Sequence, residues 1–223
     1  MKEQETIAPN SFKMIRAMAG IGILCGLLIV FTYEGTKPRI ENLRAEALKE
    51  AIFKVIPGST QMQPYVYQDN TFKAGDKSDK DVVYAGYDDS GVFKGLAIVA
   101  AGQGYADVIR IIYGYNIDQQ EVIGFYVLES KETPGLGDKI EKDPDFLNNF
   151  TDLDVSLNED KDGLKNKVTT VKSGSKVNEY EIDGITGATI SSRAIGDIIA
   201  SSAEKWMPII HKNRSIFKNI DNE

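Results

Sequence analysis

Hydrophobic and polar positions follow three different patterns along this chain of 223 residues. The first pattern is an uncharged apolar run, AMAGIGILCGLLIVFTY, over residues 17–33. As a helix this run is about 25 Å long, close to the thickness of the hydrocarbon core of a bilayer. The apolar stretch extends further toward the N-terminus if Arg16 reaches out to the membrane surface. We therefore predict an N-terminal tail over residues 1–13 and a transmembrane anchor over residues 14–34.

A buried helix of a soluble protein and a cleaved signal peptide are the two alternatives for this run. No A-x-A-like cleavage site follows it before Pro38, which favours an uncleaved anchor. Lysine and arginine flank the run on both sides, so the positive-inside rule does not decide its orientation. Because short N-terminal tails most often stay in the cytoplasm, we expect the soluble part on the extracytoplasmic side.

The second pattern is a helical period that follows the anchor. Apolar residues recur every three or four positions from Ile40 to Val55. Pro38 is typical of a first helical turn, and the pair Pro57–Gly58 ends the pattern. We predict a connecting helix over residues 35–58.

The third pattern consists of short apolar or alternating runs, which are typical of strands. Residues 59–81 are polar, and the stretch GDKSDKD within them predicts a loop. Turn signals DDSG and NIDQQ then separate apolar runs. The predicted strands, in succession, are 82–87, 92–100, 107–115 and 121–129. Four consecutive strands predict an antiparallel meander.

The remaining elements complete the expected fold. We predict a short helix over residues 143–150, a small hairpin of strands 168–172 and 177–182, and a closing helix over residues 190–206. Strands in runs with segregated helices indicate the α+β class, with an antiparallel sheet and flanking helices. This folded domain is expected over residues 59–206, followed by a C-terminal tail over residues 207–223.

Composition excludes several classes of function. The net charge of -7 and the lack of a basic patch argue against a nucleic-acid partner. With one cysteine, Cys25, and one histidine, His211, the chain cannot form an internal disulfide, a thiolate-bound iron–sulfur cluster or a zinc site. His211 lies beside other basic residues and is expected at the surface. We predict no metal ligand and no catalytic side chain.

Two glycine-containing stretches remain candidates for ligand contacts. GQGY, residues 102–105, lacks the third glycine and the strand–turn–helix context of a dinucleotide-binding loop, and is expected to be a bend in a strand. SKETPGLGDK, residues 130–139, follows a strongly apolar strand. Its prolines and glycines predict a tight turn whose backbone can approach a ligand, although an ordinary turn has the same composition.

The stretch DGITGATISSR, residues 183–193, places an unusual number of hydroxyl residues at the start of a helix. Thr189 is expected just before that helix, where its oxygen can cap free N–H groups. A helix N-terminus also attracts phosphate, with Ser191, Ser192 and Arg193 as additional donors. An N-cap and a phosphate site both remain open from these residues alone.

The pattern D-x-x-[ST]-G-A-T, formed by Asp183, Thr186, Gly187, Ala188 and Thr189, resembles the recognition motif for covalent flavin attachment. Together with the N-terminal span, the GQGY stretch and KETPGLG, it is similar to the flavin-binding domain of Rnf G subunits and Nqr C subunits. The length is closer to that of Rnf G.

The resemblance implies a covalent FMN-binding domain. It implies that a flavin transferase, recognising Asp183, links FMN through its phosphate to Thr189. The other cofactor-binding residues that it implies are Thr186, Gly187, Ala188, Ser191 and Ser192, together with the loop residues Glu132, Thr133, Pro134, Gly135, Leu136 and Gly137.

The function that the resemblance implies is electron transfer within a membrane complex. The chain would be an anchored subunit of a bacterial ion-translocating ferredoxin:NAD oxidoreductase in the cytoplasmic membrane, without stand-alone activity, and other Rnf membrane subunits would be its partners. One alternative is the C subunit of a Na⁺-translocating NADH:quinone reductase. An alternative of another class is a flavin-free, membrane-anchored binding or assembly protein.

Overall fold

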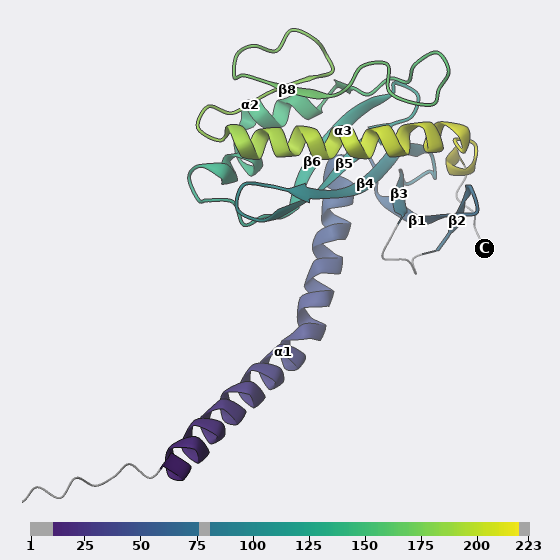
Figure 1. The fold of residues 1–223 in the computed structure, drawn as a ribbon. Coiled ribbons are helices and arrows are strands. Elements are labelled where there is room, and N and C mark those ends of the chain that lie inside the picture. Colours follow the sequence, from purple (N-terminus) through teal and green to yellow (C-terminus); the bar gives the residue numbers. More distant parts are fainter. Residues whose placement is uncertain (1–10, 76–80, 219–223) are drawn as a thin grey trace, which may run out of the picture. The chain divides into compact units, whose positions relative to one another are not determined.

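The structure is a computed structural model that describes residues 11–75 and 81–218 (Figure 1). The chain divides into two compact units between Glu46 and Ala47, and each unit is described by itself. Most of the predicted N-terminal tail, and residues 76–80 of the predicted GDKSDKD loop, lie outside the described residues.

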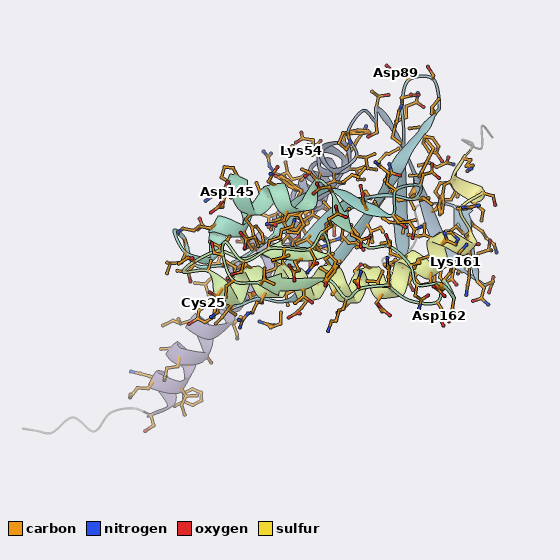
Figure 2. The ribbon with its side chains drawn as sticks, turned by 90° about the horizontal axis from the view of Figure 1, so that it is seen from above. Cys25, Lys54, Asp89, Asp145, Lys161 and Asp162 are labelled. Atoms are coloured by element: carbon orange, nitrogen blue, oxygen red, sulfur yellow. The ribbon has the colours of Figure 1, made fainter. Side chains whose placement is uncertain are left out.

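One long helix replaces the two that the sequence predicts. Helix α1 (Ser11–Val55) runs through Pro38 without a break, so the predicted anchor and connecting helix are continuous. Its most apolar stretch has a mean hydropathy of 2.3, and it is the one helix in the described part of the chain long and apolar enough to cross a membrane. The apolar side chains of this stretch are exposed, and Cys25 lies among them (Figure 2).

The second unit is built on an antiparallel sheet, which confirms the predicted α+β class. The strand order is β2-β1-β3-β4-β5-β6-β7. The strands are β1 (Gln61–Gln68), β2 (Thr71–Ala74), β3 (Val82–Tyr87), β4 (Phe93–Gln103), β5 (Val108–Asn116), β6 (Glu121–Glu129) and β7 (Leu153–Asp154). The predicted meander corresponds to β3 through β6, whose neighbours all pair antiparallel.

The hairpin of β1 and β2 lies in a polar region for which the sequence predicts no strand. Strand β1 reads QMQPYVYQ, in which Tyr65 is buried and the other residues are partly or fully exposed. The turn residues Asp69 and Asn70 have positive φ angles of 53° and 63°, which is the geometry of a tight hairpin turn. The sequence prediction named no strand in residues 59–81 and therefore missed β1 and β2.

Each face of the sheet is covered by a helix. Helix α3 (Thr189–Lys212) lies across one face and forms the larger core with β4 and its neighbours (Figure 1). The end of α1 covers the other face, where Ile52 and Val55 pack with Ala97 and Ile112.

The end of α1 approaches the sheet closely because two paired glycines lie beneath it. Gly114 on β5 and Gly124 on β6 are register partners. A Cβ atom at either position would lie 1.8 Å or 2.5 Å, respectively, from the carbonyl oxygen of Val55. Only glycine leaves room for this contact.

Short elements connect β6 to α3. They are η1 (Gly137–Glu141), α2 (Pro144–Leu147), η2 (Asn148–Phe150), β8 (Thr169–Val171) and β9 (Glu181–Asp183). The predicted helix over residues 143–150 corresponds to α2 and η2, and Asp143 caps it by accepting bonds from the amides of Asp145 and Phe146.

Strands β8 and β9 pair in parallel, so the predicted hairpin was wrong. The reason is an extra chain reversal before β9. The carboxylate of Glu181 accepts hydrogen bonds from the amides of Val177 and Asn178 and folds the segment back on itself. Strand β9 then starts in the same direction as β8.

The domain also continues beyond the predicted end of its last helix. Helix α3 extends to Lys212, and η3 (Ile216–Lys218) follows it. Met207, Ile210 and Phe217 are fully buried in the main core. The structure thus differs from the predicted C-terminal tail, because the apolar period of α3 persists past Pro208.

Candidate functional site

A pocket of ≈ 340 Å³ lies where two loops meet the start of α3, and we name it the Thr189 pocket. The loops are those that follow β4 and β6. The pocket is lined by Tyr105, Glu132, Thr133, Leu136, Gly137, Gly187, Ala188, Thr189, Ile190 and Ser191. Two motifs that lie about fifty residues apart in the sequence therefore share one cavity.

Thr189 is the first residue of α3 and not its cap. The N-cap residue is Ala188, and no side chain caps the helix. The first amide with a helical partner is that of Ser192, which donates to the carbonyl of Ala188 over 2.9 Å. Within the described residues, the amides of Thr189, Ile190 and Ser191 have no acceptor. Three residues that line the pocket therefore have amides that are not used inside the helix.

The side chain of Thr189 is available for chemistry. Thr189 is exposed, and its hydroxyl has no hydrogen-bond partner among the described residues. The preceding Gly187 has a φ of +87°, and nothing lies within 4 Å of where a Cβ would be. Glycine is required there by backbone conformation, and it leaves the approach to Thr189 open.

The two serines that follow Thr189 point inward. Ser192 is fully buried; its hydroxyl donates to the carbonyl of Thr189 over 3.2 Å and accepts from the amide of Ile185 over 3.4 Å. Ser191 is 3% exposed and donates to Glu132. The three hydroxyls thus have different surroundings, and only that of Thr189 faces solvent.

Glu132 forms part of the wall of the pocket and is 5% exposed. Its Oε2 accepts the hydroxyl of Ser191 over 2.5 Å, and its Oε1 accepts the amide of Ala106 over 3.0 Å. In the described residues no lysine or arginine pairs with it. The carboxylate therefore depends on these neutral donors for its hydrogen bonds.

The remainder of the predicted loop forms the expected tight turn. Gly135 has a φ of +78°, and the amide of Leu136 donates to the carbonyl of Thr133 over 3.1 Å. Asp138 accepts from the amide of Gly135 and from Lys142, and the hydrogen bond from Lys142 is the main reason that the pKa of Asp138 lies below its usual value.

Large apolar side chains surround the mouth of the Thr189 pocket. Tyr105, Leu136 and Ile190 are 65%, 52% and 55% exposed. Side chains of this kind at a pocket rim are suited to the face of a flat, largely apolar ligand. Pro134 and Gly135 belong to the turn but do not line the cavity.

An ion pair lies beside this rim. Lys131 Nζ and Asp107 Oδ2 are 2.5 Å apart on the two loops. The hydrogen bond from Lys131, followed by that from the amide of Val108, lowers the pKa of Asp107. The same bond raises the pKa of Lys131. Both side chains are largely exposed, so the pair contributes little to stability.

A second, more polar cavity of ≈ 430 Å³ lies on the other side of the TGAT loop, and we name it the Asp183 pocket. Thr186 and Asp183 line this pocket and do not line the Thr189 pocket. The carboxylate of Asp183 accepts bonds from the amides of Gly174 and Ser175, over 2.9 Å and 3.2 Å. The predicted motif is therefore divided between two cavities.

Asn149 holds this motif in place, although no sequence pattern indicated it. Its Oδ1 accepts the amide of Asp183 over 2.9 Å, and its Nδ2 donates to the carbonyl of Asp183 over 3.2 Å. Asn149 is 4% exposed and also donates to the carbonyl of Phe146 over 2.9 Å. A polar residue in a predicted helix gives no signal of a contact 34 residues away.

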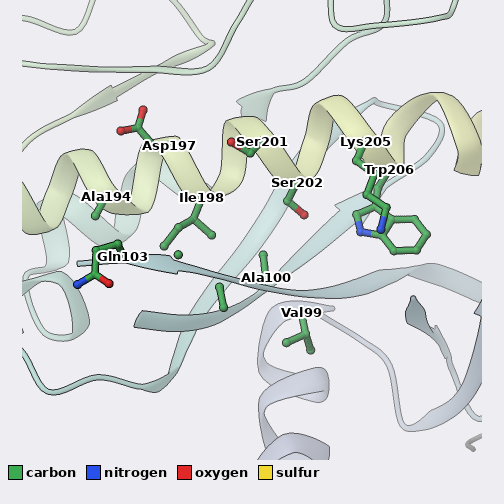
Figure 3. A pocket seen from close by; sticks show the side chains of 12 residues that line it. Val99, Ala100, Gln103, Ala194, Asp197, Ile198, Ser201, Ser202, Lys205 and Trp206 are labelled. Atoms are coloured by element: carbon green, nitrogen blue, oxygen red, sulfur yellow. The ribbon is translucent and has the colours of Figure 1, made fainter. Parts of the chain in front are cut away.

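A groove of ≈ 380 Å³ is lined by residues of β4 and of the middle of α3 (Figure 3). Ile198 and Ser202 point from α3 toward the strand, and Trp206 lies at one end (Figure 3). A Cβ at Gly102 would lie 2.5 Å from Ile198, so the strand and helix are in close contact here. None of the predicted site residues lines this groove.

The single histidine does not take part in these cavities. His211 is half-buried near the end of the helix and lines none of the three cavities described here. Partial burial, followed by the positive charges of Lys161 and Arg214, lowers its pKa.

Comparisons with known proteins agree with the motifs. Residues 104–204 match the FMN-binding domain family. The G subunit of the ion-translocating oxidoreductase complex from Methanosarcina acetivorans is 30% identical over 197 residues, covering 86% of this chain and 92% of that protein. The G subunit of the complex of the same name from Erwinia tasmaniensis is 34% identical over 164 residues, covering 72% of each chain.

Solved structures show the same fold. The C subunit of the Na⁺-translocating NADH-quinone reductase from Parabacteroides distasonis matches with a TM-score of 0.60 and 20% identity, covering 77% of this chain and 96% of that one. NqrC from Shewanella oneidensis matches with a TM-score of 0.55 and 16% identity, covering 78% and 95%. These two structures show the fold, and the sequence identity to the G subunits is higher. The chain belongs to the family of G subunits of ion-translocating oxidoreductase complexes, with an FMN-binding domain, which confirms the resemblance to Rnf G.

Proposed function

We propose that this chain is a membrane-anchored electron-transfer subunit of an ion-translocating ferredoxin:NAD oxidoreductase complex, with FMN bound covalently through its phosphate to Thr189. The observation that carries the proposal is the exposed, unpartnered hydroxyl of Thr189 at the amide-rich start of α3 within the described chain. It lies in the wall of a pocket inside the region that matches the FMN-binding domain.

The start of α3 suits a phosphate group. The amides of Thr189, Ile190 and Ser191 supply free donors, and the helix dipole favours a negative charge at this end. These amides would hold a phosphate esterified to Thr189. Ser191 and Ser192 support this arrangement indirectly, because their hydroxyls are engaged inside the protein.

The Thr189 pocket suits the rest of the cofactor. Its volume of ≈ 340 Å³ falls in the range of small-molecule sites, and its rim presents Tyr105, Leu136 and Ile190. FMN supplies the redox chemistry when bound, since it accepts and donates electrons one or two at a time. The residues of this chain bind and orient it: Gly137 and Ala188 line the pocket, and Gly187 leaves the approach to Thr189 open.

We assign attachment to a separate flavin transferase that recognises Asp183 and Thr186. These two residues line the Asp183 pocket, next to the attachment loop rather than inside the Thr189 pocket. A transferase contact from that side leaves the Thr189 pocket free for the cofactor. The carboxylate of Asp183 also holds the turn at residues 174–175, so its substitution affects the loop as well.

The proposed setting is the cytoplasmic membrane, with the domain on its extracytoplasmic side and other proteins of the complex as partners. The apolar helix α1 and the names of the related proteins support the anchor and the complex. The C subunit of a Na⁺-translocating quinone reductase is the second candidate, which the shared fold favours. Identities of 30% to 34% with G subunits, against 16% to 20% with the C-type structures, favour the first.

In-gel fluorescence tests the proposal. The full chain is produced in a host that supplies the flavin transferase and is separated on a denaturing gel under ultraviolet light. A fluorescent band near 24.6 kDa is expected for the native chain, and its loss is expected in Thr189→Ala. Thr189→Ser, which keeps a hydroxyl, is expected to retain part of the signal.

Ser201→Ala is the matched control, since it removes another exposed hydroxyl from the same helix. The control is expected to fluoresce like the native chain. A fluorescent band of full intensity in Thr189→Ala contradicts attachment at Thr189. A native chain without flavin, from a host whose transferase labels a positive-control substrate, supports the flavin-free binding protein instead.

A further inference from the structure

We infer that Glu132 is a positioning residue whose buried carboxylate fastens together the three segments that form the Thr189 pocket; this rests on the proposed function. The three segments are the loop after β4, the loop after β6 and the first turn of α3. They come from distant parts of the chain, and their contacts converge on this side chain.

Each oxygen of the carboxylate holds a different segment. Oε1 accepts the amide of Ala106, which fixes the loop after β4, and Oε2 accepts the hydroxyl of Ser191, which fixes α3. Glu132 itself belongs to the loop after β6. The two donors, an amide and a hydroxyl, are directed at the two different oxygens of one side chain.

Two glycines of the motifs make room for this carboxylate. A Cβ at Gly104 would lie 2.5 Å from Oε1, and a Cβ at Gly137 would lie 2.6 Å from Oε2. Gly104 is the second glycine of GQGY, and Gly137 is the last glycine of ETPGLG. Both motifs therefore carry a glycine where the Glu132 carboxylate packs against their backbone.

The location of Glu132 also gives it an electrostatic effect on the ligand. Its side chain lines the cavity in which we place the flavin, is almost fully buried, and has no ion-pair partner in the described ranges 11–75 and 81–218. A negative charge in such surroundings disfavours the addition of electrons to a neighbouring group. Glu132 thus positions the pocket and lowers the reduction potential of its flavin.

The positioning role is tested first without flavin, by hydrogen exchange on the full-length chain carrying Thr189→Ala. Adding Glu132→Ala is expected to speed exchange of the Ala106 amide by about tenfold or more, because that amide loses a hydrogen bond to a charged group. Adding Glu132→Gln is expected to preserve most of the protection, since the amide oxygen still accepts from Ala106. Glu129→Gln, an exposed glutamate on β6, is the control and leaves Ala106 unchanged.

The second measurement uses the flavin-loaded chain with Thr189 intact. Glu132→Ala is expected to lower flavin loading about tenfold, because the attachment turn is no longer held in place. Glu132→Gln is expected to load nearly normally and to show a higher flavin reduction potential in a spectroscopic titration. Glu129→Gln keeps the native potential.

The outcomes separate this inference from the proposed function. Native exchange at Ala106 in Glu132→Ala overturns the positioning role whether or not the chain carries flavin. A native potential in flavin-loaded Glu132→Gln overturns the electrostatic role. A native chain that carries no flavin refutes the proposed function, while the exchange measurement still decides whether Glu132 joins the three segments.

Discussion

Three hydroxyl residues at the start of α3 have three different roles because of where each one points. Thr189 faces solvent beside the pocket, Ser191 donates to a buried carboxylate, and Ser192 closes the loop that precedes the helix. All three lie within about one helical turn, which distributes them among these surroundings. The proposed attachment site is the one hydroxyl of the three without an internal partner among the described residues.

Asn149 is the residue whose substitution most directly tests how the attachment loop is held. Asn149→Ala removes two hydrogen bonds to the backbone of Asp183 and leaves those partly buried groups without their partner. We expect a loss of about 2 kcal/mol in the free energy of unfolding, measured by chemical denaturation of the full chain in detergent. Asn148→Ala, an exposed neighbour, is expected to change it little. Equal stabilities for the two variants contradict this role.

Part of the predicted motif lies together in the structure because its residues are contiguous in the sequence. Thr189, Gly187 and Ala188 belong to one short pattern, and the structure places all three in the wall of one pocket. The roles of Glu132 and Asn149 depend on partners that lie 59 and 34 residues away. Contacts between residues so far apart cannot be inferred from a single sequence, so these roles are identified only from the folded structure.

At the level of elements, the contact between α1 and the sheet depends on Gly114. Gly114→Ala places a methyl group 1.8 Å from the backbone oxygen of Val55 and forces the helix end away from β5. We expect a loss of about 3 kcal/mol in unfolding free energy and a lower Tm. The backbone oxygen cannot rotate away as a flexible side chain can.

Gly35→Ala is the matched control for this substitution. Gly35 lies in the same helix, and a Cβ there meets nothing within 4 Å. Because alanine favours helix more than glycine does, the control is expected to be neutral or slightly stabilising. A Gly114→Ala variant as stable as Gly35→Ala would show that the end of α1 is not packed on β5 and β6.

The strands that the sequence predicts well are those with apolar alternation or apolar runs, β3 through β6. Strand β1 is not predicted, because it contains three glutamines and Pro64, although Tyr65 is buried in the core. The parallel pairing of β8 with β9 is not predicted, because the chain reversal before β9 is stabilised by the side chain of Glu181 and has no recognisable turn sequence. Local patterns predict an element, but the direction of pairing depends on contacts between elements.

At the scale of the whole molecule, the boundary between the two units lies inside α1 and not at its end. Residues from Ala47 onward belong to the second unit, and Ala51, Ile52, Val55 and Ile56 are fully buried against the sheet. The predicted boundary at residue 59 leaves these residues outside the domain. We propose instead that the folded domain begins at about Ala47.

Two truncated chains test this boundary. A chain that starts at Ala47 is expected to fold as a soluble domain, with a cooperative thermal transition. A chain that starts at Pro57 lacks the helix that covers one face of the sheet. The loss of Ile52, Val55 and Ile56 removes about 5 kcal/mol of apolar burial, which is comparable to the net stability of a domain.

The shorter chain is therefore expected to aggregate or to unfold at a much lower temperature. Equal Tm values for the two truncated chains would contradict a domain that includes the end of α1. The comparison needs no flavin, so it tests the fold independently of the proposed function.

The central claim is that Thr189 carries FMN through a phosphoester, and the intact mass of the chain tests it most directly. The full chain and Thr189→Ala are purified from a host that supplies the flavin transferase. The intact mass of each is measured by mass spectrometry, and each is then digested so that the modified peptide can be identified. We predict that the native chain gains the mass of one FMN less one water, located on the peptide that contains Thr189, and that Thr189→Ala has the unmodified mass. An unmodified native chain alongside a substrate that the same transferase does label, or FMN on another residue, would contradict the claim.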